Sequence, residues 1–368
     1  RRREKTERWI CSYPGGRHVV IMKEAMYYER LSDGKVRCRL CPFNCTIDDG
    51  QVGVCKARKN IDGTLYSLIY SQYTGSPFDP IEKKPLFHFY PDWKIMSLGT
   101  LGCNFACEFC QNWSSSQALA ERGEKILSGF TKTITPEEAV YIAKSTHEKG
   151  NIGIAYTYNE PLIGYEYVYE TAKLLKKEGL KNVLVTNGYI NQEPLMELLP
   201  YIDAMNIDIK SINNDFYVKL CKARLEPVLE TCKTASEYCL LEITNLVIPT
   251  QNDSDEELEK LTDWIAENLG PHTPLHFSRY HPDYRLTIKA TPEKTLIKAM
   301  EIARKKLHYV YIGNIWGVNG ENTMCPSCSR VVIGRSGYML TCYEINDDGK
   351  CNFCGANIHI TGTFRTYQ

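Results

Sequence analysis

The chain of 368 residues has no excess charge of either sign, because 44 lysines and arginines balance 44 aspartates and glutamates. It therefore lacks the basic surplus with which many proteins bind nucleic acids or anionic membranes. It also contains no apolar run near the roughly 20 residues that a membrane-spanning helix requires, and no secretory signal pattern is visible. We expect a cytoplasmic protein whose partners include neither a membrane nor a nucleic acid.

Cysteine, by contrast, is abundant, with 16 residues in the chain. Eleven of them fall into three groups with the spacing of metal ligands, and the other five are scattered. Domains held together by disulfides are usually short and secreted, so a disulfide framework fits this chain poorly. The cysteine usage favours metal binding in a reducing, oxygen-poor cytoplasm.

The middle group is Cys103-x3-Cys107-x2-Cys110, with Phe109 directly before the third cysteine. Three thiolates from one loop can hold three irons of a four-iron cluster and leave the fourth iron open to a small molecule, whereas four cysteine ligands close a cluster. Open catalytic zinc sites differ from closed structural ones in the same way. A zinc or disulfide cluster is the alternative that the spacing alone leaves open.

The N-terminal group is Cys38-x2-Cys41-x3-Cys45-x9-Cys55, with proline and glycine turn formers between the cysteines. Four soft ligands at this spacing predict a closed four-thiolate site. Either zinc or a second iron–sulfur cluster would satisfy it. A purely structural role is the simpler interpretation of this group.

The C-terminal group consists of two C-x2-C pairs, Cys325 with Cys328 and Cys351 with Cys354, separated by 22 residues. Two such pairs resemble a zinc ribbon, in which one tetrahedral zinc stabilises a module too small to have a core of its own. A rubredoxin-like iron site is the alternative. Cys342 lies between the pairs and is not an expected ligand.

Between residues 94 and 312 apolar segments typical of strands alternate with amphipathic segments typical of helices. Thr135 with Glu138, and Ser254 with Glu257, form capping boxes that predict the starts of two helices. The expected strands are 94–99, 152–156, 183–186, 204–209, 240–247, 275–278 and 310–312; besides the helix that begins after Thr135, helices are expected near 166–178, 192–199, 226–239, 255–268 and 292–306.

This alternation predicts an α/β fold with a parallel sheet and right-handed crossovers. Six or seven units are too few for a closed eight-stranded barrel, so we expect a partial (β/α)6-type barrel. The expected parts are an extension at 1–34, a cysteine-rich module and linker at 35–92, the partial barrel at 93–320 and the zinc-ribbon-like module at 321–368.

Polar residues follow these strands at their carboxyl ends, where parallel barrels gather their chemistry. Each alone would be an ordinary loop residue, but their repetition at the same end of successive strands predicts a binding site. The candidates are Tyr158, Asn159, Glu160, Asn187, Asp208, Lys210, Asn245, His276, Arg279 and Gly313.

Eight motifs together resemble the radical S-adenosylmethionine (SAM) superfamily, and within it the AmmeMemoRadiSam-system proteins, which are relatives of the pyruvate formate-lyase-activating enzymes. Some activating enzymes carry ferredoxin-like inserts with eight cysteines, whereas this chain has the N-terminal group and the C-terminal ribbon. The motifs are PIEKKPL at 80–86, GCNF at 102–105, CQNW at 110–113, AYTYNEP at 155–161, VTNGY at 185–189, NIDIK at 206–210, PLHFSR at 274–279 and YIGN at 311–314.

The resemblance implies that Cys103, Cys107 and Cys110 bind a 4Fe–4S cluster whose open iron chelates the amino and carboxylate groups of SAM. Phe109 would pack by the adenine. The stretch 158–160 stands where relatives hold the SAM amino group, with Asn-Glu in place of their Gly-Gly-Glu. This resemblance therefore makes the middle group the cofactor-binding loop.

The resemblance extends to the later strand ends. Asp208 and Lys210 match positions that meet the ribose and carboxylate region of SAM, and His276 and Gly313 match positions near SAM and its adenine. SAM is a zwitterion with a sulfonium, so it needs acceptors for an ammonium, a cation for a carboxylate and an apolar slot. The polar strand ends supply these types of group.

The implied reaction is radical chemistry. A reductant such as ferredoxin or flavodoxin supplies one electron, and cleavage of SAM gives a 5′-deoxyadenosyl radical that abstracts hydrogen from a substrate. The substrate is a glycyl-radical protein, another protein partner or a small molecule. The alternatives are an RNA-modifying radical SAM enzyme and a non-enzymatic electron carrier. Cys221 is a candidate catalytic residue at the substrate radical, or a buried structural cysteine.

Overall fold

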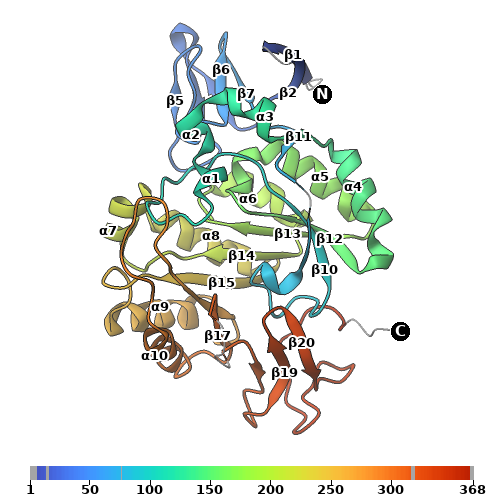
Figure 1. Ribbon diagram of the computed structural model, residues 1–368, viewed down its shortest axis with the longest axis vertical. Helices are drawn as coiled ribbons and strands as arrows, with labels where there is room; N and C mark the ends of the chain where they lie inside the picture. The colour runs from blue at the N-terminus through green and yellow to red at the C-terminus, as the bar shows by residue number, and fades with distance from the viewer. Residues whose placement is uncertain (1–5, 14–15, 76, 316–319, 365–368) are drawn as a thin grey trace. The chain divides into compact units, whose positions relative to one another are not determined.

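A computed structural model describes residues 6–13, 16–75, 77–315 and 320–364 (Figure 1). The chain divides into two compact units, each made of two segments. The first unit comprises Arg1–Phe78 and Met96–Asp203, and the second comprises Asp79–Ile95 and Ala204–Gln368. Within the described ranges, no helix has both the length and the apolar character needed to cross a membrane.

Parallel strands form the centre of the first unit. Strand β12 (Asn151–Tyr156) is buried along its whole length and pairs in parallel with β13 (Lys181–Thr186). The two strands approach closely at Gly153, where an added Cβ atom would lie 1.9 Å from the carbonyl oxygen of Lys181. A side chain at this position would force the strands apart, so the sequence needs glycine there.

Helices α4 (Pro136–Ser145) and α5 (Tyr165–Lys177) pack against β12 and β13 respectively (Figure 1). The capping box expected at the start of α4 is confirmed. Thr135 Oγ1 accepts a hydrogen bond from the Glu138 amide at 3.2 Å, and the Glu138 carboxylate accepts one from the Thr135 amide at 2.8 Å. Two amides at the helix start are thereby satisfied.

Residues 1–34 show no clear periodicity in the sequence, yet they contribute three strands to two antiparallel sheets. One sheet has the order β1 (Thr6–Tyr13), β2 (Gly16–Glu24), β7 (Thr64–Ser67), β6 (Arg58–Ile61), and the other has the order β3 (Tyr28–Arg30), β4 (Val36–Cys38), β5 (Thr46–Ile47).

Arg58 joins the N-terminal sheets to helix α5. Its guanidinium donates to both carboxylate oxygens of Glu166 at 2.6 and 2.8 Å, and both side chains are only 1% exposed. The guanidinium also donates to the carbonyl oxygens of Met26 and Ile163, and Glu166 accepts from the Met26 amide at 2.7 Å. These hydrogen bonds offset the cost of burying both charges.

The second unit contains four consecutive parallel strands, with helices between them. The strands are β14 (Ala204–Asp208), β15 (Leu240–Val247), β16 (Leu275–Arg279) and β17 (Val310–Gly313), and the helices are α8 (Glu226–Ser236), α9 (Asp255–Asn268) and α10 (Glu293–Ala303).

The capping box expected at the start of α9 is wrong in one half. The Ser254 hydroxyl accepts from the Glu257 amide at 3.2 Å, as predicted. The Glu257 carboxylate, however, accepts from the Ile212 amide at 2.9 Å and from the Ser211 hydroxyl. A tertiary contact therefore takes the carboxylate that the local pattern assigned to the helix start.

The C-terminal module is a three-stranded antiparallel sheet of β18 (Thr323–Met324), β19 (Val331–Ser336) and β20 (Met339–Tyr343). It belongs to the second unit and packs on that unit's other segment, Asp79–Ile95. There Arg335 donates to the carbonyl oxygen of Phe87 at 2.8 Å, so the ribbon is held by the segment that contains the PIEKKPL motif.

Shorter elements complete the units, and β9 and β10 lie where the segments of the two units meet in the chain. The shorter elements are β8 (Gln72–Tyr73), β9 (Phe78–Pro80), β10 (Lys94–Leu98), α1 (Trp113–Ser116), α2 (Ala118–Arg122), α3 (Leu127–Phe130), β11 (Lys132–Thr133), α6 (Gln192–Leu198) and α7 (Asn214–Phe216). The predicted α/β fold with a parallel-rich central sheet is confirmed, since the expected strands coincide with β10 and β12 to β17.

Candidate functional site

The three-cysteine loop follows strand β10. Cys107 is buried, and Cys103 and Cys110 are half-buried. Burial, and then the negative charge of Glu160 and of the other two thiols, raises the pKa of the Cys103 thiol well above its usual value. The Cys103 sulfur also accepts a hydrogen bond from the Phe105 amide at 3.3 Å. Since a bound cation favours thiolates, this crowding of acidic groups is suited to holding a positively charged iron site.

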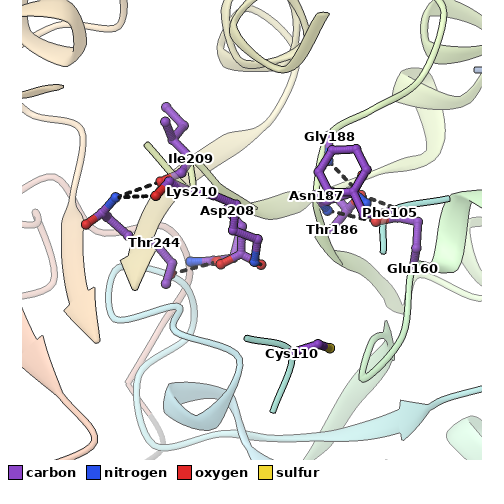
Figure 2. Close-up of polar contacts among 12 residues, drawn as sticks. Phe105, Cys110, Glu160, Thr186, Asn187, Gly188, Asp208, Ile209, Lys210 and Thr244 are labelled. Atoms are coloured by element: carbon purple, nitrogen blue, oxygen red, sulfur yellow. Dashed lines mark hydrogen bonds and ion pairs between the residues drawn. The ribbon is translucent and has the colours of Figure 1, made fainter. Parts of the chain in front are cut away.

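The Glu160 carboxylate is held at the end of β12 (Figure 2). It is 3% exposed and accepts hydrogen bonds from Thr186 Oγ1 at 2.7 Å, from the Asn187 amide at 2.8 Å and from the Leu162 amide at 3.0 Å. These donors fix the carboxylate in one orientation, and one of them, Asn187, also reaches the Cys103 sulfur with its side-chain nitrogen at 3.8 Å. A fixed, buried carboxylate is a suitable acceptor for an ammonium group.

Asn159 braces the cysteine loop. Its side-chain oxygen accepts from the Thr100 amide and its side-chain nitrogen donates to the Gly102 carbonyl oxygen, each at 2.9 Å. The neighbouring Tyr158 has a φ of 74° and lies against Gly99, where an added Cβ would meet its ring at 2.8 Å. The structure thus shows Asn159 positioning the loop; contact with SAM stays a prediction for this residue.

Asn187 connects the loop after β13 to the cysteine loop. Its side-chain nitrogen lies 2.8 Å from Asn104 Oδ1 and 3.8 Å from the Cys103 sulfur. Asn104 in turn donates to the carbonyl oxygen of Tyr189 at 3.0 Å. The sequence did not single out Asn104 as a site residue, although its place in the GCNF motif beside Cys103 was a signal that could have found it.

In the second unit, Asp208 and Lys210 form an ion pair of 2.7 Å at the end of β14 (Figure 2). Asn245 donates to the carbonyl oxygens of Ile209 and Lys210 at 2.9 and 3.3 Å, so it fixes the backbone that carries the lysine. Among the described residues, Asn245 Oδ1 is a buried acceptor without a hydrogen-bond partner. Such an atom is suited to accepting a ligand hydroxyl.

His276 does not stand alone on β16. Its Nε2 lies 2.6 Å from Glu242, a buried carboxylate on β15 that also accepts from the amides of Phe87 and His88. Burial acts to raise the pKa of Glu242, but the hydrogen bond and charge of His276 hold it below its ordinary value. The sequence missed Glu242 because no local pattern marks it.

The remaining predicted residues have simpler surroundings. Arg279 Nε donates to the Thr291 carbonyl oxygen at 2.9 Å, and Gly313 ends β17 opposite Ser278. Phe109 is buried. Cys221 is fully buried within the single π-helical turn Tyr217–Cys221, which favours the structural alternative for this cysteine.

The four C-terminal cysteines converge. Among the residues that the structure describes, they are the one group of three or more potential ligands whose donor atoms all lie within 4.8 Å of one another. The Cys325 and Cys354 sulfurs are 3.6 Å apart, and those of Cys328 and Cys351 are 3.8 Å apart. Zinc–sulfur bonds of about 2.3 Å in a tetrahedron place the sulfurs about 3.8 Å apart, so one tetrahedral metal fits.

The sequence comparisons agree with this geometry. Residues 98–265 match the radical SAM superfamily. The chain is 47% identical over 345 residues to the uncharacterized protein MJ0808 of Methanocaldococcus jannaschii, covering 92% of this chain and 99% of that protein.

Two further relatives are described as activating enzymes. A putative glycyl-radical enzyme activating enzyme of the same organism, MJ1632, is 26% identical and aligns over 58% of this chain and 79% of its own length. The pyruvate formate-lyase-activating enzyme of Clostridium pasteurianum is 23% identical and aligns over 56% of this chain and 88% of its own length.

These findings define the protein as an enzyme with a domain of the radical SAM superfamily at residues 98–265. The superfamily implies a 4Fe–4S cluster and SAM as cofactors. The three cysteines of the loop after β10 fit such a cluster, because one short loop supplies three thiols, the Cys103 sulfur accepts from an amide, and Asn187 links the loop to the buried Glu160.

Proposed function

We propose that the protein binds a 4Fe–4S cluster through Cys103, Cys107 and Cys110 and cleaves SAM reductively to form a 5′-deoxyadenosyl radical. The cofactors supply the electron transfer and the radical, and the chain supplies binding and orientation. The observation that carries the proposal is that Asn187 links the three-cysteine loop to a preorganised carboxylate: its amide donates to Glu160, and its side-chain nitrogen donates to Asn104 beside Cys103.

Each residue would act through the groups that it presents. Glu160 is proposed to accept a hydrogen bond from the amino group of SAM, since its three donors hold the carboxylate in place. In the second unit, Lys210 is proposed to bind the carboxylate of SAM. Asp208 and Asn245 Oδ1 are proposed to accept hydrogen bonds from the ribose hydroxyls of SAM. His276, Arg279 and Gly313 are proposed as further contacts.

The C-terminal group is proposed to hold zinc. Its support is the match between the sulfur separations of 3.6 and 3.8 Å and a tetrahedral zinc site. The ribbon has a small apolar cluster that includes Val332, Ile333 and Ile345. A metal would supply much of the stability that so small a core lacks.

The substrate is proposed to be a protein, of the glycyl-radical kind or another, because two relatives are described as activating enzymes. A small molecule is the alternative. The electron donor is proposed to be a low-potential protein of the ferredoxin or flavodoxin type, in the cytoplasm.

The test is SAM cleavage by anaerobically reconstituted full-length protein reduced with dithionite. We expect 5′-deoxyadenosine to form, and we expect Cys107→Ala to abolish it. The matched control is Cys342→Ala, which removes an exposed cysteine on β20 and should cleave SAM at the wild-type rate. Equal product from wild type and Cys107→Ala would refute the assignment of the cluster.

A further inference from the structure

The four N-terminal cysteines line one cavity. Cys38 ends strand β4, Cys41 and Cys45 lie in the following loop, and Cys55 precedes β6. The other lining residues are mostly apolar, and they are Leu40, Phe43, Ile47, Gly53, Val54, Arg58 and Ile163. Four cysteine thiolates around one cavity can supply all the ligands of a metal site, so that no position on the metal remains open to a small molecule.

The spacing of these sulfurs differs from that of the zinc-like C-terminal group. Among the described residues only the C-terminal group has three or more donor atoms within 4.8 Å of one another, so no three of the N-terminal sulfurs are that close. One zinc ion needs its four sulfurs about 3.8 Å apart. A four-iron cluster needs wider spacing, because each thiolate binds a different iron.

Hydrogen bonds and a cation suit the N-terminal site to an anionic cluster. The backbone of Ala57 donates a hydrogen bond to the Cys55 sulfur. The buried guanidinium of Arg58 lines the same cavity as the four cysteines and places a positive charge at its wall. Amide donors to sulfur and nearby charge are features by which proteins tune iron–sulfur clusters.

The N-terminal site also contacts the three-cysteine loop directly. The carbonyl oxygen of Cys55 lies 3.1 Å from where a Cβ atom at Gly102 would be, immediately before Cys103. The Tyr189 ring contacts both Phe43 of the N-terminal loop and Phe105 of the three-cysteine loop, with centroids 5.1 Å apart in each pair. Both sites belong to the first unit.

We propose that Cys38, Cys41, Cys45 and Cys55 hold a second, closed iron–sulfur cluster that passes electrons to the cluster site at Cys103, Cys107 and Cys110. A ferredoxin- or flavodoxin-type donor gives one electron to the closed cluster, which gives one electron to the open cluster. No bond or proton changes in this step. The electron-transfer part of the proposal rests on the proposed function, whereas the metal content of the N-terminal site does not.

The first experiment isolates the N-terminal site. The full chain with Cys103, Cys107 and Cys110 all changed to Ala is purified without oxygen and reconstituted with iron, sulfide and zinc. We expect about four irons and four acid-labile sulfides per chain. Adding Cys41→Ser and Cys45→Ser should remove the iron and sulfide and keep the C-terminal zinc. A second zinc per chain without sulfide would overturn the proposal, whether or not the wild type cleaves SAM.

The wild type provides a check that does not depend on a multiple variant folding. It should bind about eight irons per chain, and the Cys41→Ser/Cys45→Ser variant about half as many, while Cys342→Ser should match the wild type. Four irons in the wild type, with two zincs, would count against the second cluster.

The second experiment tests contact between the clusters. Electron paramagnetic resonance spectra of fully reduced wild type should show signals broadened by magnetic interaction between two paramagnetic centres. The spectra of the two cysteine variants described above should each show one sharp signal. A wild-type spectrum equal to the sum of those two would contradict the electron route.

Discussion

The buried ion pair between Arg58 and Glu166 offers a sharp test of how the cysteine-rich N-terminal module is attached. Glu166→Gln keeps the shape of the side chain and its ability to accept from the Met26 amide, but it removes the carboxylate charge that pairs with the buried Arg58 guanidinium. Removing one partner of a buried pair costs about 3–5 kcal/mol. The expected loss in the free energy of unfolding is of that size.

The matched control is Glu178→Gln, which breaks an exposed ion pair with Lys144 by the same chemical change. Its side chains are 65% and 38% exposed, for Lys144 and Glu178, so the cost should be at most about 1 kcal/mol. Urea unfolding of both variants and of the wild type, without oxygen and with the metal sites intact, measures the difference. Equal losses in the two variants would refute the reasoning.

Four other predictions test separate parts of the structure. Thr135→Ala removes the cap of α4 and should lower the free energy of unfolding by about 1 kcal/mol. Burial lowers the pKa of His88 to about 4, below its value of about 6.5 in an unfolded chain, so stability should fall as the pH drops from about 6.5 to about 4; His88→Gln should flatten this dependence. Cys325→Ser should release one zinc, by metal analysis, and leave SAM cleavage unchanged. Glu160→Gln should weaken SAM binding, measured by calorimetry, by about tenfold or more.

Each of these predictions has a contrary result. They are an unchanged unfolding midpoint for Thr135→Ala, equal pH dependence of the two proteins for His88→Gln, full zinc content for Cys325→Ser, and wild-type affinity for Glu160→Gln. The last would show that the carboxylate does not bind the amino group of SAM.

Local patterns predicted the elements of the fold well. The apolar runs identify the strands because a parallel strand that is buried on both faces is apolar along its length, as in β12. Thr135 marks the start of α4 because both of its cap partners lie within the same turn. The capping box predicted at Ser254 forms only in part, because the Glu257 carboxylate accepts from the Ile212 amide and not from the Ser254 amide.

The site was predictable only in part, because some of its contacts join residues that are far apart in the sequence. The spacing of Cys103, Cys107 and Cys110 is a local property, so the sequence displays it. The hydrogen bond between Asn104 and Asn187 spans 83 residues, and the pairing of Arg58 with Glu166 spans 108. Contacts at such separations depend on the folded chain and leave no periodic pattern in the sequence.

The most direct test of the central claim is a hyperfine measurement on the reduced protein with SAM labelled with 15N in its amino group. The account predicts a strong coupling between the labelled nitrogen and the reduced cluster, because the iron without a cysteine ligand binds that group. The coupling should disappear in Cys107→Ala. No coupling in wild-type protein with an intact, reduced cluster at the three-cysteine loop would contradict the claim that its open iron binds SAM.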